Sequence, residues 1–150
     1  DYDGAYKVSG EPLKRLRVGF AKPDDVIYTH KGSVGRVAVC DRECILTPQT
    51  TYYRVNPEAI DNGYLRLFLL SPQFRLQVDA VKGQTTRDFV PIKAQYNFFV
   101  RLPPLSEQKR IVSKVTHLLS QVTRLESTLT RRESTRTQLL TAAIHQLLEG

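Results

Sequence analysis

The sequence predicts an α+β protein: a small mixed α/β domain with short strands in residues 1–104, then a long C-terminal coiled-coil helix in residues 105–150. The composition changes sharply at Pro103-Pro104, because all 8 prolines, 7 tyrosines and 6 phenylalanines lie at or before this point. Downstream, Leu, Ser, Thr, Gln, Glu, Arg and Lys dominate, and neither glycine nor proline occurs before Gly150. Such a segment has the composition of a helix.

Short strands are predicted where β-branched and aromatic residues gather, at Asp25–Thr29, Arg36–Cys40 and Tyr52–Val55. Gly32 and Gly35 separate the first two segments. Because glycines between two strand-like segments are typical of a turn, we expect these two strands to form a hairpin.

The spacing changes between Asn62 and Val81, where apolar residues recur at helical intervals. Ser71-Pro72 interrupts this pattern, so we expect two helical segments. A polar loop follows at Gly83–Asp88, and Phe98–Leu102 predicts one more strand.

The long helix is predicted to begin with Ser106 as its cap and to run for about 43 residues, or roughly 64 Å. Alternating steps of four and three from Ile111 give a heptad seam, which Arg132 and Arg136 interrupt. A domain of about 100 residues is too small to cover this seam, so part of it must meet another helix. An amphipathic helix folded onto its own domain is the alternative. The residues predicted to pair are Ile111, Val115, Leu118, Val122, Leu125, Leu129 and Leu139.

The net charge of +7 supports a polyanionic partner only modestly. It divides into +4 on residues 1–104 and +3 on residues 105–150, so neither part is a highly charged arm.

The inventory of reactive residues excludes several classes of protein. Cys40 and Cys44 are the only cysteines, and no second Cys or His pair stands nearby, which argues against a zinc site. Two thiols without an apolar leader fit a reducing, cytoplasmic setting. The apolar runs are far shorter than the roughly 20 residues that cross a bilayer.

No catalytic set with suitable spacing occurs. Asp24 and Asp25 precede a strand, where carboxylates serve as turn and cap residues, and the sequence indicates neither a basic nor a metal partner for them. Ser33 lacks the G-x-S-x-G spacing of a hydrolase nucleophile. The sequence therefore predicts binding rather than chemistry.

Two glycine-containing loops hold candidate binding residues. The turn Gly32–Arg36, next to Lys31, can present backbone N–H groups to a phosphate, although a plain hairpin turn explains it equally well. The loop Gly83–Asp88, next to Lys82, contains an amide able to pair with adenine and an arginine suited to guanine or phosphate. A polar surface loop is the alternative there.

Three stretches together resemble the specificity subunit of type I restriction-modification systems. Asp25–Val39 is similar to that family's strand, Gly-x-x-Gly turn and strand, and Gly83–Arg87 is similar to its polar Gly-Ser/Thr loop. Leu102–Val112 resembles the entry into the family's long conserved helix, and Leu139–Ala143 resembles its close. The resemblance extends from about Val18 to the end of the chain.

This resemblance implies two target recognition domains that each read one half of a bipartite DNA site, separated by two antiparallel helices that act as a ruler. It further implies that modification subunits methylate adenine at N6 with S-adenosylmethionine, and that restriction subunits use ATP and Mg to translocate and cleave DNA. No cofactor is expected on this chain itself.

The chain departs from the family's pattern in two ways, because it holds only one such unit and because the family's opening strands normally precede the region matched by Val18–Val39. We therefore interpret it as one recognition domain, without its usual N-terminal portion, and one spacer helix. A fragment, a proteolysed product and a naturally short half-subunit stay open as its origin, and the absence of methionine fits a piece of a longer chain.

We therefore predict a non-catalytic DNA-recognition module. Gln84 and Thr86 would read base edges, Arg36 and Arg87 would read a base or hold phosphate, and Lys31 and Lys82 would hold phosphate. The candidate DNA-binding residues are Lys31, Ser33, Arg36, Lys82, Gln84, Thr85, Thr86 and Arg87.

The expected partners are double-stranded DNA, modification and restriction subunits, and a second specificity half or copy that pairs through an antiparallel coiled coil. Two alternatives stay open from the sequence. One is the recognition domain of a single-chain methyltransferase-nuclease, and the other is a coiled-coil interaction module that binds protein instead of DNA.

Overall fold

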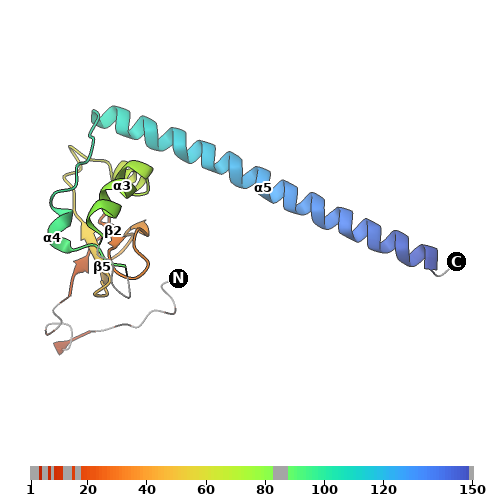
Figure 1. The fold of residues 1–150 in the computed structure, drawn as a ribbon, viewed down its shortest axis with the longest axis horizontal. Helices are drawn as coiled ribbons and strands as arrows, with labels where there is room; N and C mark the ends of the chain where they lie inside the picture. The colour runs from red at the N-terminus through yellow and green to blue at the C-terminus, as the bar shows by residue number, and fades with distance from the viewer. Residues whose placement is uncertain are drawn as a thin grey trace. The chain divides into compact units, whose positions relative to one another are not determined.

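The computed structural model describes residues 4, 7, 9–11 and 15, together with residues 18–82 and 88–148. The chain divides into two compact units, Asp1–Gln108 and Lys109–Gly150. The first unit contains short strands and helices, and the second belongs to one long helix (Figure 1).

A three-stranded antiparallel sheet forms the centre of the first unit (Figure 1). Its middle strand β2 (Val26–Thr29) lies between β3 (Val37–Val39) and β5 (Thr50–Tyr53). The pairing of Ile27 with Ala38 sets the register of the β2–β3 hairpin, which confirms the predicted hairpin. The order β3-β2-β5 leaves no free edge on β2.

A second sheet, which the sequence did not predict, joins β1 (Phe20–Ala21) to β4 (Cys44–Ile45). Each strand has only two residues, which is too short for an alternating pattern to be recognised. Phe20 pairs with Ile45 and Ala21 pairs with Cys44.

The two predicted helical segments are α2 (Asn62–Leu69) and α3 (Pro72–Val81). Each begins with a side-chain cap, because Asp61 accepts a hydrogen bond from the Tyr64 N–H and Ser71 accepts one from the Phe74 N–H. A short helix, α4 (Ile92–Gln95), follows and was not predicted, because one turn is too short to show helical periodicity.

The core depends on the alternation of side chains along β2. Val26 and Tyr28 are fully buried on one face, and the Tyr28 ring packs against Phe74 of α3 with 5.8 Å between ring centroids. Ile27 points to the other face and packs against a smaller cluster of Ala21, Cys40 and Leu46. One strand therefore contributes to both hydrophobic clusters of the unit.

The prediction of a strand at Phe98–Leu102 is wrong, because this segment is irregular. Its backbone is satisfied by a side chain instead of a neighbouring strand. The Phe99 N–H donates to Gln77 Oε1 at 2.8 Å, and Gln77 Nε2 donates to the Phe99 carbonyl at 3.0 Å. Phe98 and Val100 still pack against the core, which explains the strand-like alternation of the sequence.

The predicted strand Tyr52–Val55 lies two residues earlier, at Thr50–Tyr53. Tyr53 pairs with Val26, which is the first residue of β2, so no β2 residue remains opposite Arg54. The Arg54 side chain pairs with Asp25 instead.

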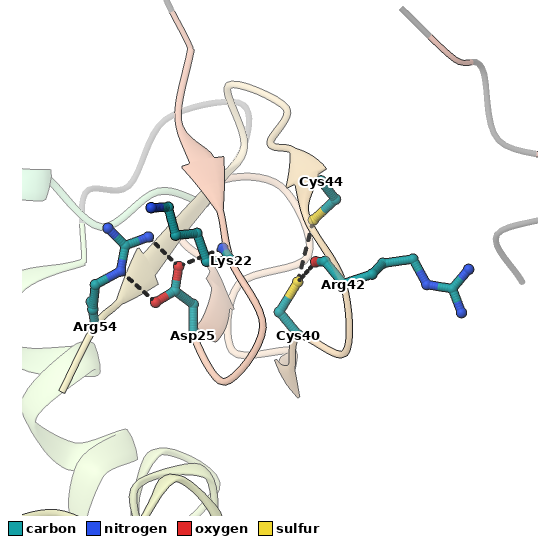
Figure 2. Close-up of polar contacts among 6 residues, drawn as sticks. All are labelled: Lys22, Asp25, Cys40, Arg42, Cys44 and Arg54. Atoms are coloured by element: carbon teal, nitrogen blue, oxygen red, sulfur yellow. Dashed lines mark hydrogen bonds and ion pairs between the residues drawn. The ribbon is translucent and has the colours of Figure 1, made fainter. Parts of the chain in front are cut away.

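Asp25 is buried and receives three hydrogen bonds (Figure 2). Arg54 donates through Nε at 2.8 Å and through Nη2 at 2.6 Å, and the Lys22 N–H donates at 2.7 Å. The hydrogen bonds from Arg54 hold the pKa of Asp25 below its ordinary value of 3.8. Asp25 therefore has a basic partner that the sequence did not indicate, because Arg54 is distant from it in sequence.

The long helix α5 (Leu105–Leu148) is continuous over 44 residues. It begins one residue before the predicted cap, so Ser106 lies inside the first turn and does not precede it. The Pro104 carbonyl accepts hydrogen bonds from the N–H groups of Glu107 and Gln108, which makes Pro104 the first residue bonded into the helix.

Gln108 attaches this first turn to the rest of the globular unit. Its side chain is fully buried, accepts from the Asp61 N–H at 2.9 Å, and donates to the carbonyls of Ala59 at 2.9 Å and Pro103 at 2.8 Å. One amide thus links the entry of α5 to the loop that caps α2. All its partners are backbone groups, so any shorter side chain leaves them without bonds.

We expect Gln108→Ala to lower the free energy of unfolding of the globular unit by about 2–4 kcal/mol, because buried backbone groups lose their partner. Urea denaturation followed by tyrosine fluorescence measures this unit, since every tyrosine lies before residue 104. Gln121→Ala, at an exposed position of the same helix, is the matched control and should change little. Equal effects of the two substitutions would contradict the anchoring role of Gln108.

We expect Asp25→Asn to lower the free energy of unfolding by about 1–3 kcal/mol near neutral pH. Since the pKa of Asp25 is lowered in the folded state, its stabilisation is complete above its ordinary value of 3.8 and is lost as pH falls through the folded pKa. The difference between wild type and variant should therefore shrink in acid. Urea denaturation across this pH range tests the prediction, with Asp41→Asn in the exposed Asp41–Arg42 pair as the control.

Candidate nucleic-acid interface

The turn between β2 and β3 places three of the predicted DNA-binding residues at the surface. Gly32 and Gly35 adopt positive φ angles of +78° and +95°, which favour glycine. The Thr29 hydroxyl accepts from the Arg36 N–H at 2.9 Å and donates to the Ser33 carbonyl at 2.5 Å, so one side chain bridges the turn. The residues that this turn exposes are Lys31, Ser33 and Arg36.

The same turn pairs with the segment that follows the polar loop. The Gly32 N–H donates to the Asp88 carbonyl at 2.9 Å, and the Val90 N–H donates to the His30 carbonyl at 2.7 Å. Lys31 and Phe89 form an antiparallel bridge between these two hydrogen bonds. The structure thus brings together the turn and one end of the loop, which are far apart in the sequence.

Lys82 and Asp88 stand at the two ends of the loop and form an ion pair of 2.7 Å. This pair holds the two ends together beside the turn. Four of the predicted DNA-binding residues belong to the loop itself and lie outside the described residues: Gln84, Thr85, Thr86 and Arg87. The ammonium group of Lys82 already pairs with the Asp88 carboxylate. The contact predicted between Lys82 and a DNA phosphate stays a prediction.

Arg75 is a candidate that the sequence did not reveal. It lies on α3, and a Cβ atom added to Gly35 would lie 3.8 Å from the Arg75 guanidinium, which places this cation beside the turn. Arg75 also pairs with Asp79 one turn along the helix at 3.1 Å. An arginine four residues before an aspartate is typical of an ordinary exposed helix face, so no signal in the sequence pointed to the turn. We refer to Lys31, Ser33, Arg36 and Arg75 as the turn cluster.

The predicted pairing residues lie on α5. Ile111 and Val115 are partly buried, whereas the side chains farther along the seam are 46% to 66% exposed. Heptad spacing places these residues along one side of the helix. This more exposed group consists of Leu118, Val122, Leu125, Leu129 and Leu139.

Cys40 and Cys44 are free thiols with 3.5 Å between their sulfur atoms, and the Cys40 thiol donates to the Arg42 carbonyl (Figure 2). Burial raises the pKa of Cys44 to about 11, so this thiol stays protonated at neutral pH. Over the described parts of the chain, no three His, Cys, Asp or Glu side chains gather as metal ligands would. None of the described helices combines the length and the apolar character that a membrane span requires.

Comparison with known proteins supports one family. Residues 20–132 match the model of the type I restriction modification DNA specificity domain. The chain is 25% identical over 120 residues to the specificity subunit of the type I restriction enzyme EcoBI from Escherichia coli, and this match covers 79% of the chain and 25% of that subunit.

Two solved structures have a similar fold. One comes from work on complex assembly and conformational transition of the type I R-M system, with a TM-score of 0.65, 25% identity, and coverage of 80% of this chain and 29% of that chain. The other is the S subunit of a type I restriction-modification system from M. genitalium, with a TM-score of 0.56, 20% identity and coverage of 73% and 29%. The chain thus spans between a quarter and a third of each of these relatives. Since the family model extends from β1 into the long helix, the chain belongs to the family of type I restriction-modification DNA specificity domains.

Proposed function

We propose that this chain is a DNA sequence-specificity module of a type I restriction-modification complex. In this proposal the globular unit reads one half of a bipartite target, and α5 pairs with another helix of the complex. The match of residues 20–132 to the family of DNA specificity domains carries the proposal.

The turn cluster and the polar loop are the proposed DNA-contacting elements. The hydrogen bond between Gly32 and Asp88 supports their joint action, because it holds one end of the loop against the turn. Lys31 and Arg36 would hold phosphates, which positions the module on the duplex without selecting a sequence. The amide, hydroxyl and guanidinium groups of residues 84–87 would contact base edges in the major groove.

The chain is not an enzyme in this proposal. Modification subunits would methylate adenine at N6 with S-adenosylmethionine, and restriction subunits would use ATP and Mg. The module would place these partners by binding DNA.

Helix α5 would act as a spacer. At 1.5 Å per residue, its 44 residues span about 66 Å, or about two turns of B-DNA at roughly 34 Å per turn. Antiparallel pairing with the helix of a second specificity half or copy would place two recognition units at opposite ends of this rod. The length of the rod would then set the distance between the two half-sites.

The decisive test is methylome sequencing of a host that carries the complete gene encoding this chain together with its modification subunit. We expect N6-methyladenine in a bipartite motif whose two specific parts are separated by unread bases. Deletion of the gene should remove that methylation. A methylome without such a motif would contradict the proposal.

We expect Lys31→Ala to weaken binding of the assembled complex to specific and random duplexes alike, and to reduce the slope of affinity against salt concentration by about one unit, as loss of a phosphate contact does. Fluorescence anisotropy over a salt series measures both effects. Lys114→Ala, an exposed lysine on α5, is the matched control and should leave DNA affinity unchanged. A loss restricted to the specific duplex would instead make Lys31 a base-reading residue.

A further inference from the structure

The apolar seam of α5 is interrupted by two consecutive charged positions. Leu125 and Leu129 precede the interruption and Leu139 follows it, and the two seam positions between them hold Arg132 and Arg136. All these side chains are exposed along the helix. We refer to Arg132 and Arg136 as the arginine belt.

The arginine belt borders a shallow groove of about 400 Å³ with an apolar floor. Neither belt arginine forms an ion pair with any residue that the structure describes. The helix itself offers few carboxylates, since residues 105–150 contain seven basic and four acidic residues. The lining residues of the groove are Arg131, Arg132, Thr135, Arg136, Leu139 and Leu140.

A partner helix that covers the seam removes the arginine belt from water. A guanidinium group in such a contact needs a facing carboxylate, because an unpaired charge loses its hydration without compensation. Apolar seam residues flank the belt on both sides, and a partner helix that buries them must also lie close to the two arginines. The belt therefore constrains the charge of the partner.

A second copy of this chain does not place carboxylates at the seam positions that face the belt. In a fully overlapping antiparallel pair, centred between Leu125 and Leu129, Arg132 faces Val122 and Arg136 faces Leu118.

Other arrangements of two copies bring like charges together. Sliding the antiparallel pair until the belts meet places Arg132 opposite Arg136. A parallel pair in register places each arginine opposite itself. Each arrangement leaves a charge facing an apolar residue or another cation, which is unfavourable in a coiled-coil core.

We propose that the helix that pairs with α5 is an amphipathic helix of different sequence, with carboxylates facing Arg132 and Arg136. The inference rests on the pairing role of α5 in the proposed function and narrows it from a second half or copy to an acidic partner. The arginine belt would then set both the register of the partner and its identity, as polar residues at core positions do in coiled coils.

Two synthetic helices with an apolar seam of matching length test this inference, one with Glu and the other with Lys at the positions facing the belt. Fluorescence anisotropy gives their dissociation constants for the full 150-residue chain. We expect the Glu peptide to bind at least about tenfold more tightly than the Lys peptide. Arg132→Glu combined with Arg136→Glu should reverse this preference.

Lys109→Glu combined with Arg124→Glu is the matched control, because it reverses two exposed charges that lie away from the seam and outside the groove. It should leave the preference for the Glu peptide in place. Circular dichroism checks that both double variants remain helical.

Equal binding of the two peptides, or no reversal in the belt variant, would overturn the inference. A stable α5-mediated dimer of this chain that excludes the Glu peptide would overturn it as well, and sedimentation over a concentration series detects such a dimer. If neither peptide binds, the pairing role itself fails along with the inference. Duplex binding by the same preparations tests the DNA-reading part of the proposed function separately, since the belt lies in the helical unit.

Discussion

The globular unit depends on strand β2, which contributes side chains to a hydrophobic cluster on each of its faces and pairs with another strand along each of its edges. Val26 and Tyr28 enter the larger hydrophobic cluster and Ile27 enters the smaller one, while β3 and β5 take the two edges. The residues that continue β2 then pair with the segment after the polar loop. A change in the register of this strand would displace both clusters and the turn cluster together, because side chains alternate strictly along a strand.

Buried polar groups set the junctions between these elements. Asp25 joins the start of β2 to the residue after β5, and Gln108 joins the first turn of α5 to the entry of α2. Both side chains are buried with their hydrogen-bonding capacity used by specific partners. Such groups define geometry more sharply than apolar contacts, because each bond has a preferred distance and direction.

The candidate DNA-binding surface was only partly predictable. The turn Gly32–Arg36 could be recognised because glycines between two strands are a local signal. The proximity of Gly32 to Asp88 could not be, since it follows from a pairing between distant segments. Arg75 could not be predicted for the same reason, since it approaches the turn from a distant helix. The ion pair between Lys82 and Asp88 likewise depends on the folded chain, which brings the two ends of the loop together. The family, in contrast, was recognisable from contiguous stretches of sequence.

Local patterns in the sequence were enough to predict the β2–β3 hairpin, the break between α2 and α3, the uninterrupted α5 and its seam with two arginines. Contacts between distant parts of the chain explain the rest: Phe98–Leu102 is not a strand, Arg54 follows the end of β5 and binds Asp25, and the loop ends lie beside the turn. Periodicity and turn residues act over a few positions, so they are present in the sequence directly. Partners brought together from distant positions exist only after the chain has folded, because folding decides which backbone and charged groups meet.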